Sequence, residues 1–485
     1  MSLYSLAFFS FFVIIFALYW SFFKKSAQSQ NLLLTASSLF FCGWADIRFL
    51  ALLIFSIIFN FYTANSIYEN QGRKRSYLLY VALIANAGLL FYYKYFNFFY
   101  ESFVQFFGLA GKGNSIGAFN IILPLGISFF TFQAIGYVVD VYNEDIKPCK
   151  SLLTFATYIT YFPKMTAGPI ERAEPFFKQV DKKREFKYSL AIDGLRQILW
   201  GAFTKLVIAN NCASIAGPIF DNYLHLPASS LLAGSFFYMF QVYCDFSGYS
   251  NIAIGISKLF GIELMRNFAA PFFSTNIRDF WKKWHISLSS WMMHYVFTPI
   301  SFTLRKLGKK GLIISILITF LVIGIWHGAN WTFIVFGLLH GLYFIPLILA
   351  GNINKSSTGD NNRKLPKPKA VFQMMGLFVL VMLTIVVFGS EDISSAFHYL
   401  SRIFSFSIFS KPLFPDQAGI SRIIITLLFI ILLIIIEWLQ KNKDHEMQID
   451  DIQSPVLRIG IYYALFFLIF AFGSIAQINF LYSSF

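Results

Sequence analysis

The sequence predicts an all-α, polytopic integral membrane protein with about eleven or more transmembrane helices, each of about 20 predominantly apolar residues. Three observations predict this class. Of the 485 residues, 57% are hydrophobic, 20% are aromatic and only 13% are charged. Mean hydropathy is +0.61. Apolar runs long enough to cross a bilayer recur from end to end, with the basic residues in short loops between them. This composition excludes a soluble globular protein.

The predicted crossings follow one another with short connections. The first, Leu3 to Phe23, lacks a basic leading region and a small-residue cleavage site, so we expect a retained helix and not a signal peptide. In chain order, the predicted crossings are residues 3–23, 30–45, 49–68, 76–93, 190–215, 231–257, 311–327, 331–350, 371–389, 420–440 and 456–473.

Two regions are less regular than a simple crossing. Between Tyr95 and Pro175, prolines and glycines interrupt the apolar runs, and the freed backbone groups need shielding by protein or a wet cavity. We therefore expect half-helices or a re-entrant segment there. The stretch from Asn267 to Lys310 mixes aromatic, basic and histidine side chains, which predicts an amphipathic segment at the inner face or dipping into the protein.

No linker is long enough to separate two domains, so the sequence indicates one integral membrane domain over residues 1–485. We divide it into N-terminal helices (3–110), a core (119–350) and C-terminal helices with an outer tail (371–485). The polar stretch Asn352–Lys369 is predicted to be a flexible inner loop.

The net charge of +15 does not indicate a nucleic-acid partner, because the lysines and arginines do not form one patch. Under the positive-inside rule they mark cytoplasmic loops, which predicts that the N-terminus and the C-terminus both lie outside. The basic loops are Lys24–Lys25, Arg73–Arg75, Lys182–Lys187, Arg305–Lys310, Lys355–Lys369 and Lys441–Lys443. The four cysteines show no paired metal spacing, and we expect no metal or redox cofactor.

Two histidines lie in the apolar stretch GIWHGANWTFIVFGLLHG, from Gly324 to Gly341. On one unbroken helix His327 and His340 would differ by about 220° and face apart. A helical hairpin turning at Gly328–Asn330 brings them together. His327 is our candidate for proton transfer, because an imidazole pKa near 6.5 suits that chemistry. His340 is either part of the same site or a packing histidine bonded to a neighbouring helix.

One carboxylate is placed where an unpaired charge is expensive. Asp245, in the sequence YCDFSGY, lies inside an apolar run, so it should have a partner. We favour a bracing role for Asp245, together with Ser247 and Tyr249, over direct catalysis.

Five stretches resemble those of one known family in content and order. They are PLGISFFTFQAIGYVVDVY (Pro124–Tyr142), YFPKMTAGPIER (Tyr161–Arg172), YCDFSGYSNIAIGISKLFGIEL (Tyr243–Leu264), NFAAPFFSTNIRDFWKKWHISLSSW (Asn267–Trp291) and WHGANW with GLLHG. The chain resembles the membrane-bound O-acyltransferase family, and within it the bacterial branch concerned with alginate O-acetylation, peptidoglycan O-acetylation and teichoic acid D-alanylation.

This resemblance implies that His327 is essential and that His285 lines the same tunnel, which the helices enclose. The two histidines are candidates for the ends of a route that carries an acyl group across the membrane. The alternative for His285 is a surface histidine of a basic amphipathic helix, beside Lys282 and Lys283.

The chemistry implied is acyl transfer from a thioester to a hydroxyl group, with His327 as the base. Candidate oxyanion donors are Asn330, the indoles of Trp326 and Trp331, or backbone N–H groups at the hairpin turn. The resemblance favours acetyl from acetyl-CoA as donor substrate, or another acyl thioester on a carrier protein, and no permanently bound cofactor. His294 stands where the family often has Asp. A basic cluster could attract the donor's phosphates or only anchor the topology; it comprises Arg305, Lys306, Lys309 and Lys310.

The C-terminal sequence AQINFLYSSF resembles the aromatic ending of this bacterial branch, in which a tyrosine is proposed to carry the acyl group briefly. Here that tyrosine is Tyr482, although Ser483 replaces an aromatic residue, and the alternative is an aromatic anchor at the membrane interface. The resemblance further implies the bacterial inner membrane and an outer-face partner of the SGNH-hydrolase type. A transporter or channel without acyl chemistry remains the alternative from a different class.

Overall fold

The computed structural model describes residues 3–106, 121–353, 366–414 and 419–474, and these are helical with no strand among them. The all-α prediction is confirmed. The chain divides into two compact units: unit 1 is Met1–Gly194 with Ile256–Met265, and unit 2 is Leu195–Gly255 with Arg266–Phe485. Two of the three unit boundaries fall inside helices, α10 (Tyr188–Ala202) and α12 (Ala228–Leu259), and the third, between Met265 and Arg266, lies in the loop after α12. The single membrane domain and its three segments stay predictions.

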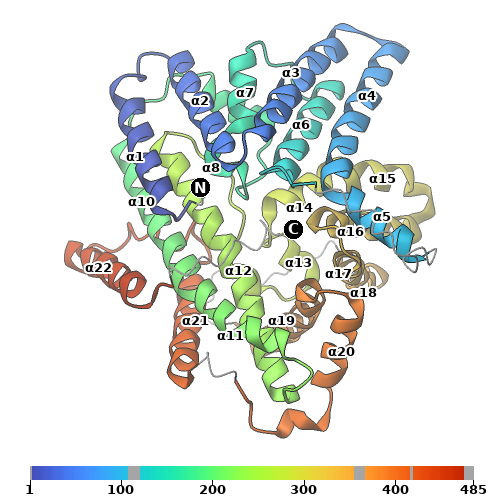
Figure 1. Cartoon of the computed structure of the whole chain (residues 1–485), viewed down its shortest axis with the longest axis vertical. Coiled ribbons are helices and arrows are strands. Elements are labelled where there is room, and N and C mark those ends of the chain that lie inside the picture. The colour runs from blue at the N-terminus through green and yellow to red at the C-terminus, as the bar shows by residue number, and fades with distance from the viewer. Residues whose placement is uncertain (1–2, 107–120, 354–365, 415–418, 475–485) are drawn as a thin grey trace, which may run out of the picture. The chain divides into compact units, whose positions relative to one another are not determined.

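Unit 1 is a bundle in which α3 (Arg48–Glu69) and α4 (Gly72–Leu90) pack against α6 (Ile127–Tyr142), and α2 (Ala27–Ala45) packs against α7 (Leu152–Thr160). Figure 1 shows these helices in blue and teal. The remaining helices of this unit are α1 (Leu6–Ser21), the π-helical turn η1 (Phe91–Tyr95), α5 (Phe96–Phe106), α8 (Phe162–Met165) and α9 (Ala173–Val180).

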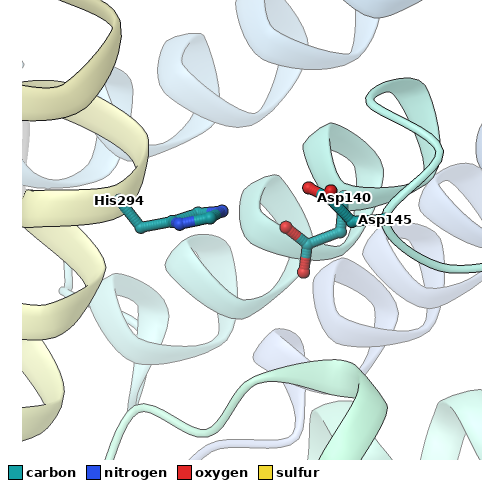
Figure 2. A group of neighbouring side chains, drawn as sticks. All are labelled: Asp140, Asp145 and His294. Atoms are coloured by element: carbon teal, nitrogen blue, oxygen red, sulfur yellow. The ribbon is translucent and has the colours of Figure 1, made fainter.

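Short helices are present in the region between Tyr95 and Pro175, and their depth in the membrane stays a prediction. Gly126, with φ of 70°, precedes α6, and Pro163 lies in the first turn of the four-residue α8. At the other end of α6, the Asp145 amide donates to the Asp140 carbonyl at 2.9 Å. Figure 2 shows these two acidic side chains; the third residue labelled there, His294, belongs to unit 2.

Unit 2 contains the candidate histidines His285, His327 and His340. Besides the short helices between Asn267 and Lys310 described below, its helices are the end of α10, the π-helical η3 (Phe203–Ala209), α11 (Asn210–Asp221), most of α12, α16 (Gly308–His327), α17 (Trp331–Leu342), α18 (Ile345–Leu349), α19 (Pro368–Gly389), α20 (Ile393–Ile403), η7 (Phe406–Phe409), α21 (Ile420–Gln440) and α22 (Pro455–Phe472). The hairpin arms α16 and α17 pack together, and α17 packs on α19.

Eight helical stretches among the described residues are long and apolar enough to cross a membrane, and they coincide with eight of the eleven predicted crossings. The predicted crossings 3–23, 30–45 and 231–257 also form helices, α1, α2 and α12. However, α1 has only 16 residues, and α2 and α12 carry buried polar side chains that lower their hydropathy. A multi-pass membrane protein is thus confirmed, whereas a count of eleven or more spans stays a prediction.

The segment from Asn267 to Lys310 dips into the protein in its first part. It forms η4 (Pro271–Phe273), α13 (Ile277–Trp281), α14 (Ile286–Met292), the π-helical η5 (Met293–Phe297), α15 (Thr298–Thr303) and η6 (Arg305–Leu307). Most aromatic side chains up to Trp291 are buried, with Phe272 and Phe273 half-buried, whereas the residues from Met293 to Lys310 are exposed or half-exposed. A surface amphipathic helix therefore fits only the second part.

Candidate active site

The predicted helical hairpin exists. The helix α16 ends at His327, Gly328 follows in an extended conformation, and Asn330 caps α17 by accepting from the Thr332 amide at 3.0 Å. Gly324 on α16 and Gly337 on α17 let the two arms approach closely. A Cβ on Gly337, for example, would lie 2.3 Å from the Phe320 carbonyl oxygen. The close packing fixes where the end of α16, and hence His327, lies.

His327 is almost fully buried in an aromatic environment, with 4% of its surface exposed. Its ring centroid lies 5.1 Å from that of Trp326, 5.7 Å from that of Phe336 on α17 and 5.3 Å from that of Phe388 on α19. Three helices of unit 2 therefore contribute to its surroundings.

His285 lies beside the same tryptophan. It is completely buried, which excludes the alternative of a surface histidine. Its ring centroid is 5.5 Å from that of Trp326 and 4.5 Å from that of Phe246 on α12. Burial lowers the pKa of His285 well below its usual value, and His327 nearby lowers it further. The imidazole of His285 is therefore neutral at physiological pH.

The two motif histidines thus meet across Trp326. They do not stand at opposite ends of a route, which is the arrangement that the sequence suggested. The reason is that the segment before α14 folds inward against α12 and the end of α16. The two surface hollows described lie in unit 1, and no motif histidine lines either of them. The tunnel stays a prediction.

His340 is buried on α17, where its Nδ1 accepts a hydrogen bond from Trp281 Nε1 at 3.2 Å. It shares a neighbour with His327, because the Phe336 ring centroid is 4.6 Å from that of His340. The hairpin therefore brings the two histidines to the same phenylalanine. The sequence left two alternatives for His340. The hydrogen bond from Trp281 on α13 agrees with the one in which His340 is a packing histidine bonded to a neighbouring helix.

Asp245 has the partner that its position requires. Its carboxylate pairs with the Lys205 ammonium of η3, and both side chains are buried. Ser247 and Tyr249 are buried on the same helix. The pair joins η3 to α12 one residue before Phe246, the residue that touches His285. Lys205 was missed in the sequence, where it looked like an isolated cation in an apolar run.

The predicted oxyanion donors differ in placement. Trp326 is buried beside both histidines, whereas Trp331 is 48% exposed. Asn330 uses Oδ1 for the helix cap, and its Nδ2 donates to the Glu391 carbonyl at 2.7 Å. Of Trp326, Trp331 and Asn330, Trp326 is the residue whose ring is described here as lying against the imidazoles of His285 and His327.

The basic cluster lies at the far end of α16 from His327. This helix has 20 residues, so its ends are about 30 Å apart, one hydrocarbon thickness. All four side chains are exposed, and Lys309 Nζ donates to the Leu349 carbonyl at 2.9 Å. Tyr482 lies outside the described residues.

Comparison with known proteins identifies the family. Residues 149–390, which include His285, His327 and His340, match the membrane-bound O-acyltransferase family. A peptidoglycan O-acetyltransferase of Helicobacter pylori is 32% identical over 470 residues, covering 88% of this chain and 86% of that protein. A probable alginate O-acetylase of Azotobacter vinelandii is 32% identical over 392 residues, covering 79% and 74%. A teichoic acid D-alanyltransferase of Bacillus subtilis is 33% identical over 239 residues, covering 46% and 58%.

Proposed function

Because the chain belongs to the membrane-bound O-acyltransferase family, we propose that it moves an acyl group, acetyl from acetyl-CoA, from the cytoplasm toward hydroxyl groups of an extracytoplasmic polysaccharide. The observation that carries this proposal is the buried meeting of His285 and His327 across Trp326. The names of the alginate and peptidoglycan relatives support acetyl transfer to a polysaccharide.

In the proposed reaction, His327 takes the proton of the acceptor hydroxyl as its oxygen attacks the thioester carbon. The C–O bond forms, the C–S bond breaks, and the proton passes from the imidazolium to the departing thiolate. General base catalysis of this kind contributes about 10²–10⁴-fold. His285 stays neutral and lies against the same tryptophan ring as His327. The donor is a substrate, so the reaction needs no resident cofactor.

The proposed setting is the bacterial inner membrane, with both termini outside and the basic cluster of Arg305 to Lys310 at the cytoplasmic face. An outer-face partner of the SGNH-hydrolase type would complete the transfer, with Tyr482 as a short-lived acyl carrier. Labelling a Tyr482→Phe variant beside the parent with radioactive donor tests that relay: equal labelling of both proteins excludes it.

The second candidate is transfer from a carrier-protein thioester, as in D-alanylation, which the teichoic acid relatives favour. Supplying membranes with radiolabelled acetyl-CoA separates the candidates. Acetyl-CoA consumption that disappears in His327→Ala supports acetyl transfer. A response only to a loaded carrier protein supports the second candidate, and transport without acyl consumption supports a transporter. The matched control is His225→Ala, because His225 is an exposed histidine of unit 2.

A further inference from the structure

His285 has an unusual backbone conformation. Its φ of 45° and ψ of 55° place it in the left-handed region, and it shares a positive φ with only two other non-glycine residues among those described. A side chain with a Cβ adopts this conformation rarely, and it persists only where surrounding contacts hold it. Such residues cluster at functional sites. The question is which group holds His285.

The contacts lead to Asn267, a buried residue 18 positions earlier in the chain. Its carbonyl oxygen accepts from the Ile286 amide at 2.8 Å. Its Oδ1 accepts from the Ser287 hydroxyl at 2.7 Å and from the Ser287 amide at 3.3 Å. The two residues that directly follow His285 are thus both bonded to Asn267.

The other end of the Asn267 amide is attached to α12. Its Nδ2 donates to the hydroxyl of Ser250 at 3.0 Å, and Ser250 is also buried. Ser250 lies four residues after Phe246, so both residues are on one face of the helix. That face of α12 therefore holds the ring of His285 through Phe246 and its backbone through Asn267.

A second backbone bond supports the same arrangement. The Ala269 amide donates to the Lys283 carbonyl at 3.0 Å, so residues 267–269 run beside residues 283–286. Together the bonds enclose His285 on both sides in the sequence. Asn267 satisfies this geometry because its amide carries an acceptor for Ser287 and a donor for Ser250 at once.

We propose that Asn267 is a positioning residue that keeps His285 in its strained conformation and aims its ring at Trp326 and His327; this proposal rests on the proposed function for its catalytic consequence. A misplacement of about 1 Å in a catalytic group lowers turnover by about 10²-fold. The loss therefore falls on kcat, whereas KM for the donor stays close to that of the parent.

The test compares Asn267→Ala with Asn210→Ala in the full-length protein in lipid nanodiscs. Asn210 is a matched control, since it is a buried asparagine of unit 2 whose amide donates to the Ser474 carbonyl at 2.8 Å. Two readouts are measured: kcat and KM with acetyl-CoA, and hydrogen exchange of the amides of Ile286 and Ser287. We expect Asn267→Ala to lower kcat by about 10²-fold and to speed exchange at these amides, whereas Asn210→Ala does neither.

Asn267→Asp and Ser287→Ala keep the test decisive if Asn267→Ala does not fold. An aspartate carboxylate keeps the acceptor for Ser287 but cannot donate to Ser250, so we expect Asn267→Asp to lower kcat and to speed exchange at the Ser287 amide less than Asn267→Ala does. Ser287→Ala removes one bond and should give a smaller loss of kcat.

Unchanged exchange at Ile286 and Ser287 in Asn267→Ala overturns the proposal, as does a fall in kcat no larger than that of Asn210→Ala in an active parent. Exchange does not depend on acyl chemistry. A parent that consumes no acetyl-CoA while Asn267→Ala still speeds exchange therefore refutes the proposed donor and leaves the positioning of His285 supported.

Discussion

The ion pair of Lys205 and Asp245 offers a quantitative test of how unit 2 is braced. The side chains are 1% and 3% exposed, so each charge depends on the other for compensation. The substitutions Lys205→Met and Asp245→Asn each remove one partner. Breaking a buried pair in this way costs about 3–5 kcal/mol, because it leaves one uncompensated charge in a medium of low polarity.

The double variant separates charge compensation from mere loss of side chains. Lys205→Met with Asp245→Asn contains no unpaired charge, and replacement of both members of a buried pair is often close to neutral. We expect the double variant to regain most of the stability that each single variant loses. The surface pair Glu174–Lys178, 2.7 Å apart with side chains 53% and 71% exposed, is the control. Its loss should cost about 0.3–0.5 kcal/mol.

The assay is the midpoint of thermal unfolding in nanodiscs at one fixed scan rate, because large membrane proteins often unfold irreversibly. Acetyl-CoA consumption is measured in parallel, since Phe246 beside Asp245 touches His285. Single variants no less stable than the Glu174→Gln control, or a double variant as unstable as the sum of the singles, would refute the reasoning.

Three further predictions concern the hairpin and the histidines. Gly337→Ala should push the arms of the hairpin apart and abolish activity, because its Cβ would lie 2.3 Å from the Phe320 carbonyl oxygen, whereas Gly376→Ala meets nothing within 4 Å and should be silent in the same assay. Trp281→Phe removes the donor to His340 and should cost about 1–3 kcal/mol in thermal unfolding, with kcat per folded molecule near that of the parent; a large fall in kcat would instead give His340 a functional role. The lowered pKa of His285 means that the unfolded chain takes up its proton first, so stability from this group is complete above about pH 6.5 and is lost as pH falls below that value. The unfolding midpoint of His285→Gln should therefore fall less than that of the parent between pH 6.5 and pH 5, and equal slopes would contradict the burial argument.

Much of the fold was predictable because bilayer thickness and hydropathy act on each segment separately. The hairpin is one example: Gly328 and Asn330 are a helix stop and a helix cap that can be read locally. The weaker cases are α2 and α12. Their apolar runs predicted ordinary crossings, but their polar side chains are buried by contacts that hydropathy does not describe.

The site was only partly predictable, since its residues come together through long-range packing. The need of Asp245 for a partner followed from its apolar surroundings, but the identity of Lys205, 40 residues away, did not. The inward fold before α14 contains the hydrogen bonds of Asn267 and the left-handed conformation of His285. Nothing in the local pattern of that aromatic and basic stretch specified either feature, so the surface alternative for His285 stayed open.

The degree to which water is excluded from the site decides which reaction the site favours. His285 has no exposed surface, His327 has very little, and their neighbours are aromatic rings. In the proposed reaction, exclusion of water would strengthen the hydrogen bond between the imidazole and the acceptor alcohol and would limit competing hydrolysis of the thioester. The rings of Phe336 and Phe388 lie against His327, so movement of either ring would change the exposure of this imidazole. Because these two residues lie on α17 and α19, which pack on each other, movement between those helices would couple entry of the proposed acceptor to exposure of His327, the proposed base.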